Sequence, residues 1–348
     1  MAQLLWDFGT AYELFTSLVV LHRPAVFGLR PAWAAGVRSR LPQSQRSFLE
    51  KAFSFLDIPL TWIYHLQTPK DTASVIRELS SIPAADRLAT LQFSANMPQE
   101  MKDVCRTISA KGAWDANDQE KLRSIFHRKS VQPKPSMLDN LCRAWADPLA
   151  FGENLVPALQ AYHEVFFNEE ELRLNHALQD SLAEAQRLSH QVSLHKLMDE
   201  LSHGIQFEEL ERLDSIILVP SEWVGPLITY NRSEATHMIM QFGSRQAHNV
   251  LAPADEVPTA LTRALKALGD PTRLLILRYL NSEPLTPNQI AARLRLRPPT
   301  VIHHLNTLRL AGLVRITFLP NGERRYAVRE ETLSGTIADI NRFLKETH

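Results

Sequence analysis

Cysteine is scarce in this sequence, with only Cys105 and Cys142 among 348 residues. Two cysteines this far apart do not form a thiolate metal site, and we expect both to be reduced thiols of a cytoplasmic protein. No stretch approaches the roughly 18–20 consecutive apolar residues that cross a bilayer, and no basic segment precedes an apolar run at the N-terminus. We therefore expect neither a membrane span nor a secretory signal.

Signatures of catalysis and cofactor binding are missing as well. The sequence has no glycine-rich phosphate loop, no G-x-S-x-G elbow and no H-E-x-x-H pair. We therefore predict no catalytic residues, no metal site and no resident cofactor, and we expect a protein that is not an enzyme.

Charge is distributed unevenly, although the formal net charge of the chain is zero. Residues 260–329 contain 12 Lys and Arg against 3 Asp and Glu, a net of +9, whereas residues 1–259 contain 24 against 31, a net of −7. A basic segment attached to an acidic body is typical of a module that binds a polyanion, carried by a body that does not.

The region before this basic segment predicts a helical domain with a small sheet. Residues 1–205 have apolar residues at helical spacing, interrupted by prolines. Short runs rich in β-branched and aromatic residues then predict an antiparallel sheet at about 213–243. The expected fold class is mainly α with small β, and residues 1–252 are expected to form an effector or oligomerisation domain.

A proline-containing segment at 252–258 is the predicted linker to a C-terminal domain at 258–346. Asp270-Pro271 and Thr286-Pro287 each pair a preferred N-cap with a first-turn proline, which indicates helix starts. Gln289 completes a capping box with Thr286. Within the helix that follows Asp270, the core candidates are Leu274, Leu277 and Tyr279.

The next helix, from Pro298 to about Ala311, has the pattern of a helix that enters the DNA major groove. Val301, Leu305 and Leu308 form one apolar stripe, and polar residues lie away from it. A second helix that follows a tight turn and presents polar side chains is the geometry of a helix-turn-helix.

A β-hairpin is expected after this helix. Gly312 ends the helix, and the segments 314–319 and 324–328 alternate around Pro320-Asn321-Gly322-Glu323, a strong hairpin signal. This hairpin is the predicted wing, and a short amphipathic helix at 333–344 follows it.

Two stretches of this module resemble the ArsR family of bacterial repressors. ALKALGDPTRL at 264–274 resembles the family's opening helix and signature, and TVIHHLNTLRLAGLV at 300–314 resembles its recognition helix and exit. The resemblance spans about 260–330 and implies a winged helix-turn-helix that binds DNA. It also implies dimerisation through the first and last helices, here about 260–268 and 333–345. Residues 1–252 remain an N-terminal extension of unassigned function.

Two positions depart from the family pattern. A turn residue that is often glycine is Arg295, which predicts an adjusted turn. A frequent serine is Ile302, which favours contact with a thymine methyl group over a hydrogen bond. Both departures bear on which operator is bound.

The candidate DNA contacts fall into two groups. Residues on the recognition helix are candidates to reach base edges: Thr300, Ile302, His303 and Asn306. Four arginines are candidates for phosphate contacts: Arg273, Arg309, Arg324 and Arg325.

Other sites were weighed against plainer explanations. The family's soft-metal sensors carry cysteines on the helix before the turn, but here that helix is QIAARL and has no thiol. His195 and Asp199 could share a helix face as metal ligands, or simply be solvated. All six tryptophans lie outside the winged helix, where they could line a ligand pocket or fill cores.

These observations predict a cytoplasmic homodimeric repressor that binds an inverted repeat in double-stranded DNA and has no membrane partner. An unknown small-molecule effector would change DNA affinity through the N-terminal domain. Two alternatives stay open. The winged helix could dock a protein on a helical scaffold, or the N-terminal domain could oligomerise without a ligand.

Overall fold

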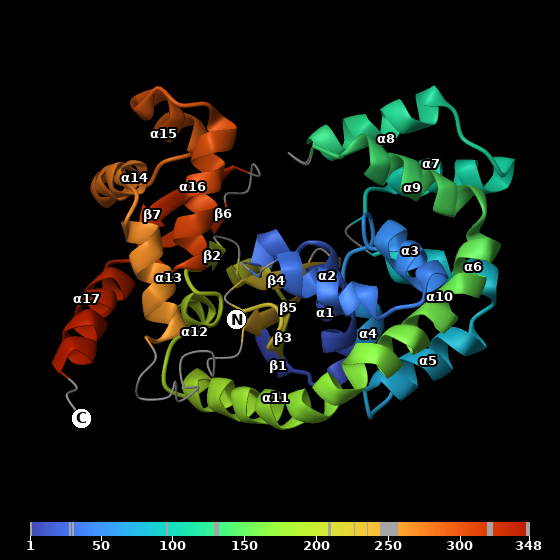
Figure 1. The fold of residues 1–348 in the computed structure, drawn as a ribbon, viewed down its shortest axis with the longest axis horizontal. Coiled ribbons are helices and arrows are strands. Elements are labelled where there is room, and N and C mark those ends of the chain that lie inside the picture. The colour runs from blue at the N-terminus through green and yellow to red at the C-terminus, as the bar shows by residue number, and fades with distance from the viewer. Residues whose placement is uncertain are drawn as a thin grey trace.

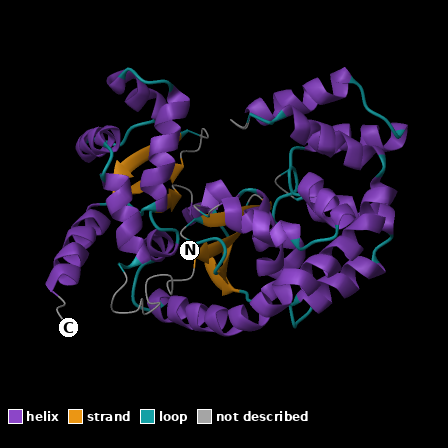
Figure 2. Ribbon diagram, viewed as in Figure 1, coloured by secondary structure: helices purple, strands orange, loops and turns teal. Residues whose placement is uncertain are grey.

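The computed structural model is mainly helical and contains a four-stranded and a three-stranded sheet (Figures 1 and 2). It describes residues 2–27, 29, 31–94, 97–128, 132–207, 210–225, 227–234, 236–243, 257–318 and 323–345. The helices and small sheets confirm the expected fold class, mainly α with small β. Within the described part, none of the helices is both long enough and apolar enough for a membrane crossing.

The helices and strands follow one another with bounds close to those that the sequence indicates. The N-terminal region contains β1 (Gln3–Trp6), α1 (Thr10–His22), η1 (Pro24–Phe27), α2 (Pro31–Ser39), α3 (Gln43–Ala52), α4 (Leu60–Tyr64), α5 (Thr72–Ser81), α6 (Ala84–Gln92), α7 (Gln99–Lys111), α8 (Ala116–Arg128), α9 (Pro135–Ala146), α10 (Pro148–Tyr162), η2 (His163–Phe167), α11 (Asn168–Ser189), α12 (Leu194–Leu201), β2 (Ile205–Phe207), η3 (Leu210–Arg212), β3 (Ser215–Ser221), β4 (Ile228–Glu234) and β5 (His237–Gly243). The C-terminal region contains α13 (Thr259–Leu268), α14 (Pro271–Ser282), α15 (Pro287–Leu294), α16 (Pro298–Leu310), β6 (Val314–Phe318), β7 (Arg324–Val328) and α17 (Glu330–Lys345).

The N-terminal helices pack around one large apolar core. Helix α1 lies inside it, and Leu14, Leu18 and Leu21 on this helix are fully buried. A helix that is covered on all sides is apolar all round, as α1 is. Helix α10 continues through the π-helical segment η2 into α11, and this long helical path runs past the sheet toward α12 (Figure 1).

The four-stranded sheet has the order β1-β3-β5-β4, and its pairing corrects the antiparallel sheet expected from the sequence. Only β4 and β5 are antiparallel, whereas β3 pairs in parallel with both β1 and β5. The physical reason is burial on both faces, which parallel strands require. Ile217 and Val219 face the helical core, and Ile216 and Leu218 face a second apolar cluster shared with α11 and α12.

The C-terminal region has an apolar core of its own. Val301, Leu305 and Leu308 are fully buried, as the stripe on the recognition helix predicted. The prediction for α14 was partly wrong, because Leu274 is 50% exposed while Leu277 is buried and Tyr279 is partly covered. The run of apolar residues on α14 offered two possible stripes, and the one that includes Ile276 and Leu280 is the one that packs inward.

A strand from the N-terminal region completes the wing sheet. β2 pairs in parallel with β6, with Ile205 opposite Ile316, and β6 pairs with β7 as the expected hairpin. The predicted hairpin turn at 320–322 lies outside the described residues, although Glu323 beside it is described. The predicted linker lies outside them as well, except for its last two residues.

Candidate nucleic-acid interface

Local signals position the two helices of the helix-turn-helix. Thr286 and Gln289 form the predicted capping box at the start of α15, in which each side chain accepts a hydrogen bond from the other residue's backbone N–H. Arg295 ends this helix in the left-handed conformation, with φ at 53°. The turn expected to be adjusted therefore keeps the backbone shape that glycine would adopt, and arginine adopts it instead.

The recognition helix α16 has one buried and one exposed face. Its buried face is the stripe that contains Val301, and its partners come from the module's own core. Thr300, His303 and Asn306 are exposed, and Ile302 is 43% exposed. Residues three and four apart on a helix are neighbours on one face, so His303 and Asn306 share a surface that Ile302 adjoins. The N-terminal body does not cover these side chains.

The wing arginines lie at the base of the hairpin. Thr317 on β6 pairs with Arg325 on β7, which places Arg325 two residues from the last described residue before the turn. Arg325 is about half exposed, with a guanidinium nitrogen 3.8 Å from Glu323 Oε2. Arg324 is exposed as well. Both positions suit cations that approach a phosphate backbone beside the groove.

Arg309, at the end of α16, has a more enclosed setting. Its Nε is buried and has no hydrogen-bond partner among the described residues. Burial lowers the pKa of Arg309, while the nearby Tyr326 favours its charged form. An arginine in this setting offers only part of its guanidinium to a ligand.

Arg273 is placed differently from the other candidate arginines. Its Nε donates to the carbonyl of Ala267 at 2.6 Å, and one Nη donates to the carbonyl of Lys266 at 2.8 Å. Its side chain is only 15% exposed and also lies 3.7 Å from Asp270. Arg273 therefore satisfies the last carbonyl groups of α13, as a cation at a helix C-terminus does.

Two arginines that the sequence analysis did not select lie at the entrance to α16. Arg295 is the left-handed turn residue and Arg297 is the N-cap of α16, and both are exposed. A helix N-terminus carries unpaired N–H groups and a partial positive charge, which favour a phosphate. Their signal was available in the turn Arg295-Leu296-Arg297, where two cations flank an apolar residue.

The candidate metal and ligand residues of the N-terminal body have other surroundings. The Asp199 carboxylate lies 3.9 Å from Lys196 Nζ and 4.0 Å from an Arg329 nitrogen. No group of three potential metal ligands occurs among the described residues. Several tryptophans pack in cores: the Trp33 and Trp223 ring centroids are 5.4 Å apart, and Trp145 Nε1 donates to Gln92 Oε1 at 2.7 Å.

Two contacts tie the body to the interface. The strand β2 extends the wing sheet, as described above. Leu310, the last residue of α16, packs against the core of the N-terminal helices. The recognition helix and the wing are thus both held by the N-terminal body.

Comparisons with known proteins match the C-terminal part of the chain. Residues 270–315 match the family model described as bacterial regulatory protein, arsR family. The chain is 38% identical over 82 residues to the HTH-type transcriptional regulator CmtR of Mycobacterium tuberculosis, covering 24% of this chain and 69% of that protein. It is 45% identical over 51 residues to an uncharacterised HTH-type transcriptional regulator of Methanocaldococcus jannaschii, covering 14% of this chain and 57% of that protein.

One solved structure is similar over the same region. The crystal structure of an ArsR family transcriptional regulator covers 27% of this chain and 98% of its own, with 23% sequence identity and a TM-score of 0.23.

Proposed function

The chain belongs to the ArsR family of bacterial regulatory proteins through its C-terminal module, and from that premise we propose that it represses transcription as a homodimer bound to an inverted-repeat operator. The observation that carries this proposal is the exposed face of α16. Thr300, His303 and Asn306 are exposed on a helix whose opposite side is anchored in a core. Such a helix fits the major groove of double-stranded DNA.

We assign each candidate a role from its setting. Thr300, His303 and Asn306 contact base edges, and Ile302 packs against a thymine methyl group. Arg324 and Arg325 contact phosphates from the wing, and Arg295 and Arg297 contact phosphates from the helix entrance. Arg309 contributes the accessible part of its guanidinium. Arg273 supports the module from within, because its donors are already used.

Exposed apolar side chains support a dimer through the first and last helices of the module. Leu265 on α13 is 42% exposed, and Ile337 and Leu344 on α17 are 55% and 71% exposed. A two-fold interface that covers these side chains would place two copies of α16 in successive major grooves, about 34–36 Å apart.

The N-terminal body is proposed to control DNA affinity. It holds the wing through β2 and the end of α16 through Leu310, so any change in its position changes both reading elements. An effector that binds one position of the body more tightly shifts DNA affinity by that difference. A body that only oligomerises remains the competing explanation, and it predicts DNA affinity that no small molecule changes.

The test is DNA binding by the full chain. A randomised duplex library selects the preferred sequence, and fluorescence anisotropy then measures affinity across a series of salt concentrations. Asn306→Ala is expected to cost about 1–3 kcal/mol at one base pair and to relax the preference there. Arg325→Ala is expected to weaken binding to all sequences and to reduce the salt slope by about 0.9.

Arg123→Ala is the matched control, because Arg123 is a similarly exposed arginine beside a glutamate on α8. It is expected to leave both measurements unchanged. A chain that selects no duplex sequence and shows no salt-dependent DNA binding would instead support the protein-docking alternative.

A further inference from the structure

A pocket of about 300 Å³ lies where α3, α9 and α10 meet, in the helical body away from the winged helix. This volume is at the lower end of the range typical of small-molecule sites. The floor of the pocket is aromatic. The Phe151 ring centroid lies 5.1 Å from that of Phe48 and 6.3 Å from that of Phe55. Ala52 and Ala144 also line the pocket, and their small side chains leave the space above the rings open.

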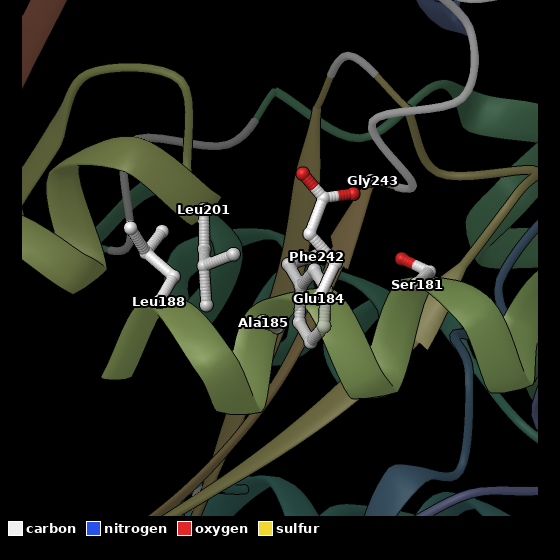
Figure 3. A pocket seen from close by; sticks show the side chains of 7 residues that line it. All are labelled: Ser181, Glu184, Ala185, Leu188, Leu201, Phe242 and Gly243. Atoms are coloured by element: carbon white, nitrogen blue, oxygen red, sulfur yellow. The ribbon is translucent and has the colours of Figure 1, made fainter. Parts of the chain in front are cut away.

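Another cavity, beside α11, provides a contrast (Figure 3). It is lined by Ser181, Glu184, Phe242 and their neighbours, and its volume is about 10 Å³. A space of that size holds about one water molecule. The pocket at α3, α9 and α10 is therefore the better candidate for an organic ligand.

The rim of the larger pocket carries an excess of positive charge. Lys51 and Arg143 line it and are exposed. The Arg143 guanidinium lies 5.7 Å from the centroid of the Trp114 ring, and within the described chain neither cation has a carboxylate in ion-pair contact. Asp147 also lines the pocket, but its side chain accepts a hydrogen bond from the Ala150 N–H and caps α10.

We propose that this pocket binds a small aromatic carboxylate, with its ring on the three phenylalanines and its carboxylate between Lys51 and Arg143. Aromatic rings pack favourably against one another at these spacings. Guanidinium and ammonium groups form charge-assisted hydrogen bonds with a carboxylate. A neutral aromatic molecule leaves both cations without an anionic partner, so the carboxylate is the preferred ligand.

The pocket has a structural connection to the DNA-binding module. Phe151 lies on α10, which continues through η2 into α11, and the chain then enters α12 and β2 (Figure 1). β2 is the strand that pairs with the wing. The ligand class deepens the proposed function by identifying the effector, and only this consequence for DNA affinity rests on that function.

Isothermal titration calorimetry of the full chain with 1-naphthoate and with neutral 1-naphthylmethanol tests the site directly. We expect 1-naphthoate to bind at least tenfold more tightly than the alcohol, because charge-assisted hydrogen bonds contribute about that factor. Lys51→Gln and Arg143→Gln are each expected to weaken naphthoate binding by about tenfold and to leave alcohol binding unchanged. Lys121→Gln, an exposed cation on α8 outside the pocket, is the control and is expected to change neither.

A volume test complements the charge test. Ala144→Leu is expected to fill the pocket and to abolish binding of both compounds, and circular dichroism checks that the variant is folded. The site proposal is overturned if naphthoate shows no binding at millimolar concentration, or if it binds the Lys51→Gln/Arg143→Gln double variant as tightly as the native chain.

DNA affinity measured with saturating naphthoate separates the two proposals. A change in affinity supports the effector role, and unchanged affinity with naphthoate bound overturns that role. Failure of the full chain to bind any duplex would refute the proposed function, while the calorimetric result would still decide the pocket.

Discussion

The backbone N–H of Ile316 donates a hydrogen bond to the carbonyl of Gly204 at 2.8 Å. Ile316 belongs to the first strand of the wing, and Gly204 immediately precedes β2 of the N-terminal region. The bond begins a parallel ladder that continues through Ile205 to Phe207. A partly buried ion pair between Arg329 and Asp199 lies beside it. The wing is therefore a strand of a shared sheet, and its position depends on the arm formed by α12 and β2.

Gly204→Ala is expected to loosen this junction. Gly204 has a φ of +96°, and an added Cβ would lie 2.6 Å from Arg329 Cδ. Strain of this kind costs about 1–3 kcal/mol. Hydrogen exchange is the measurement, and the Ile316 amide is expected to exchange faster because its acceptor is displaced. Gly36→Ala is the control, since nothing lies within 4 Å of an added Cβ there. Unchanged exchange at Ile316 would show that the junction does not need this glycine.

Arg273 and Arg325 are expected to separate stability from DNA binding. Arg273→Gln removes two hydrogen bonds that hold the end of α13, so it should lower the free energy of unfolding by about 2 kcal/mol. Its salt slope for DNA binding should stay unchanged. Arg325→Gln should change the free energy of unfolding by less than about 0.5 kcal/mol and should reduce the salt slope. Urea unfolding and anisotropy measure the two quantities. A reduced slope for Arg273→Gln would return Arg273 to the phosphate contacts.

The left-handed turn residue predicts opposite effects on stability and affinity. Arg295 has a φ of 53°, which costs a non-glycine residue about 1–2 kcal/mol. After the greater chain entropy that glycine loses on folding, Arg295→Gly should raise the free energy of unfolding by about 0.5–1 kcal/mol. Loss of the cation should weaken DNA binding. Arg295→Ala should weaken DNA binding equally but give no gain in stability. Equal stability of the two variants would argue against strain at this turn.

Glu13 predicts a stability that falls as the pH rises. Its carboxyl group is fully buried, and this burial raises its pKa from 4.5 to about 7, although Oε2 accepts hydrogen bonds from the Glu222 and Trp223 N–H groups. The folded state therefore holds the proton more tightly than the unfolded state. Stability from this group is complete below pH 4.5 and is lost as the pH rises to about 7.

The comparison with Glu13→Gln isolates this effect from the other carboxyl groups. Between pH 5 and 8, the free energy of unfolding of the native chain should fall relative to that of the variant by about 2–3 kcal/mol. Urea unfolding at the two pH values measures the difference. Parallel pH profiles for the two proteins would mean that Glu13 keeps an ordinary pKa in the folded chain.

A charge on the last helix is expected to separate the proposed dimer. Ile337→Glu places a carboxylate on the exposed apolar face of α17, where a dimer interface would have to bury it. Light scattering coupled to size exclusion should report a monomer, with weakened operator binding. Leu172→Glu is the control, because Leu172 is a 77% exposed leucine on α11. If Ile337→Glu remained dimeric and Leu172→Glu did not, the N-terminal body would be the dimerisation domain.

Sequence analysis anticipated the helix-turn-helix in detail but not the setting of its arginines. The cap at Thr286, the inward stripe through Val301 and the turn before α16 all follow from patterns within one or two helices. Arg273 was grouped with the phosphate contacts because its charge was visible and its hydrogen bonds were not. Whether a cation faces solvent or a helix end depends on how two helices cross, which periodicity does not specify.

The amino-acid sequence alone determined the family, the reading helix and its exposed residues, because caps, stripes and turn residues act over a few neighbouring positions. Only the tertiary structure decided that β2 joins the wing, that β1 pairs with β3, and that three helices enclose a pocket with a cationic rim. The first of these contacts joins segments more than a hundred residues apart. Such pairings are selected by the burial of complementary surfaces once the chain has collapsed, and no local pattern specifies which distant partner is chosen.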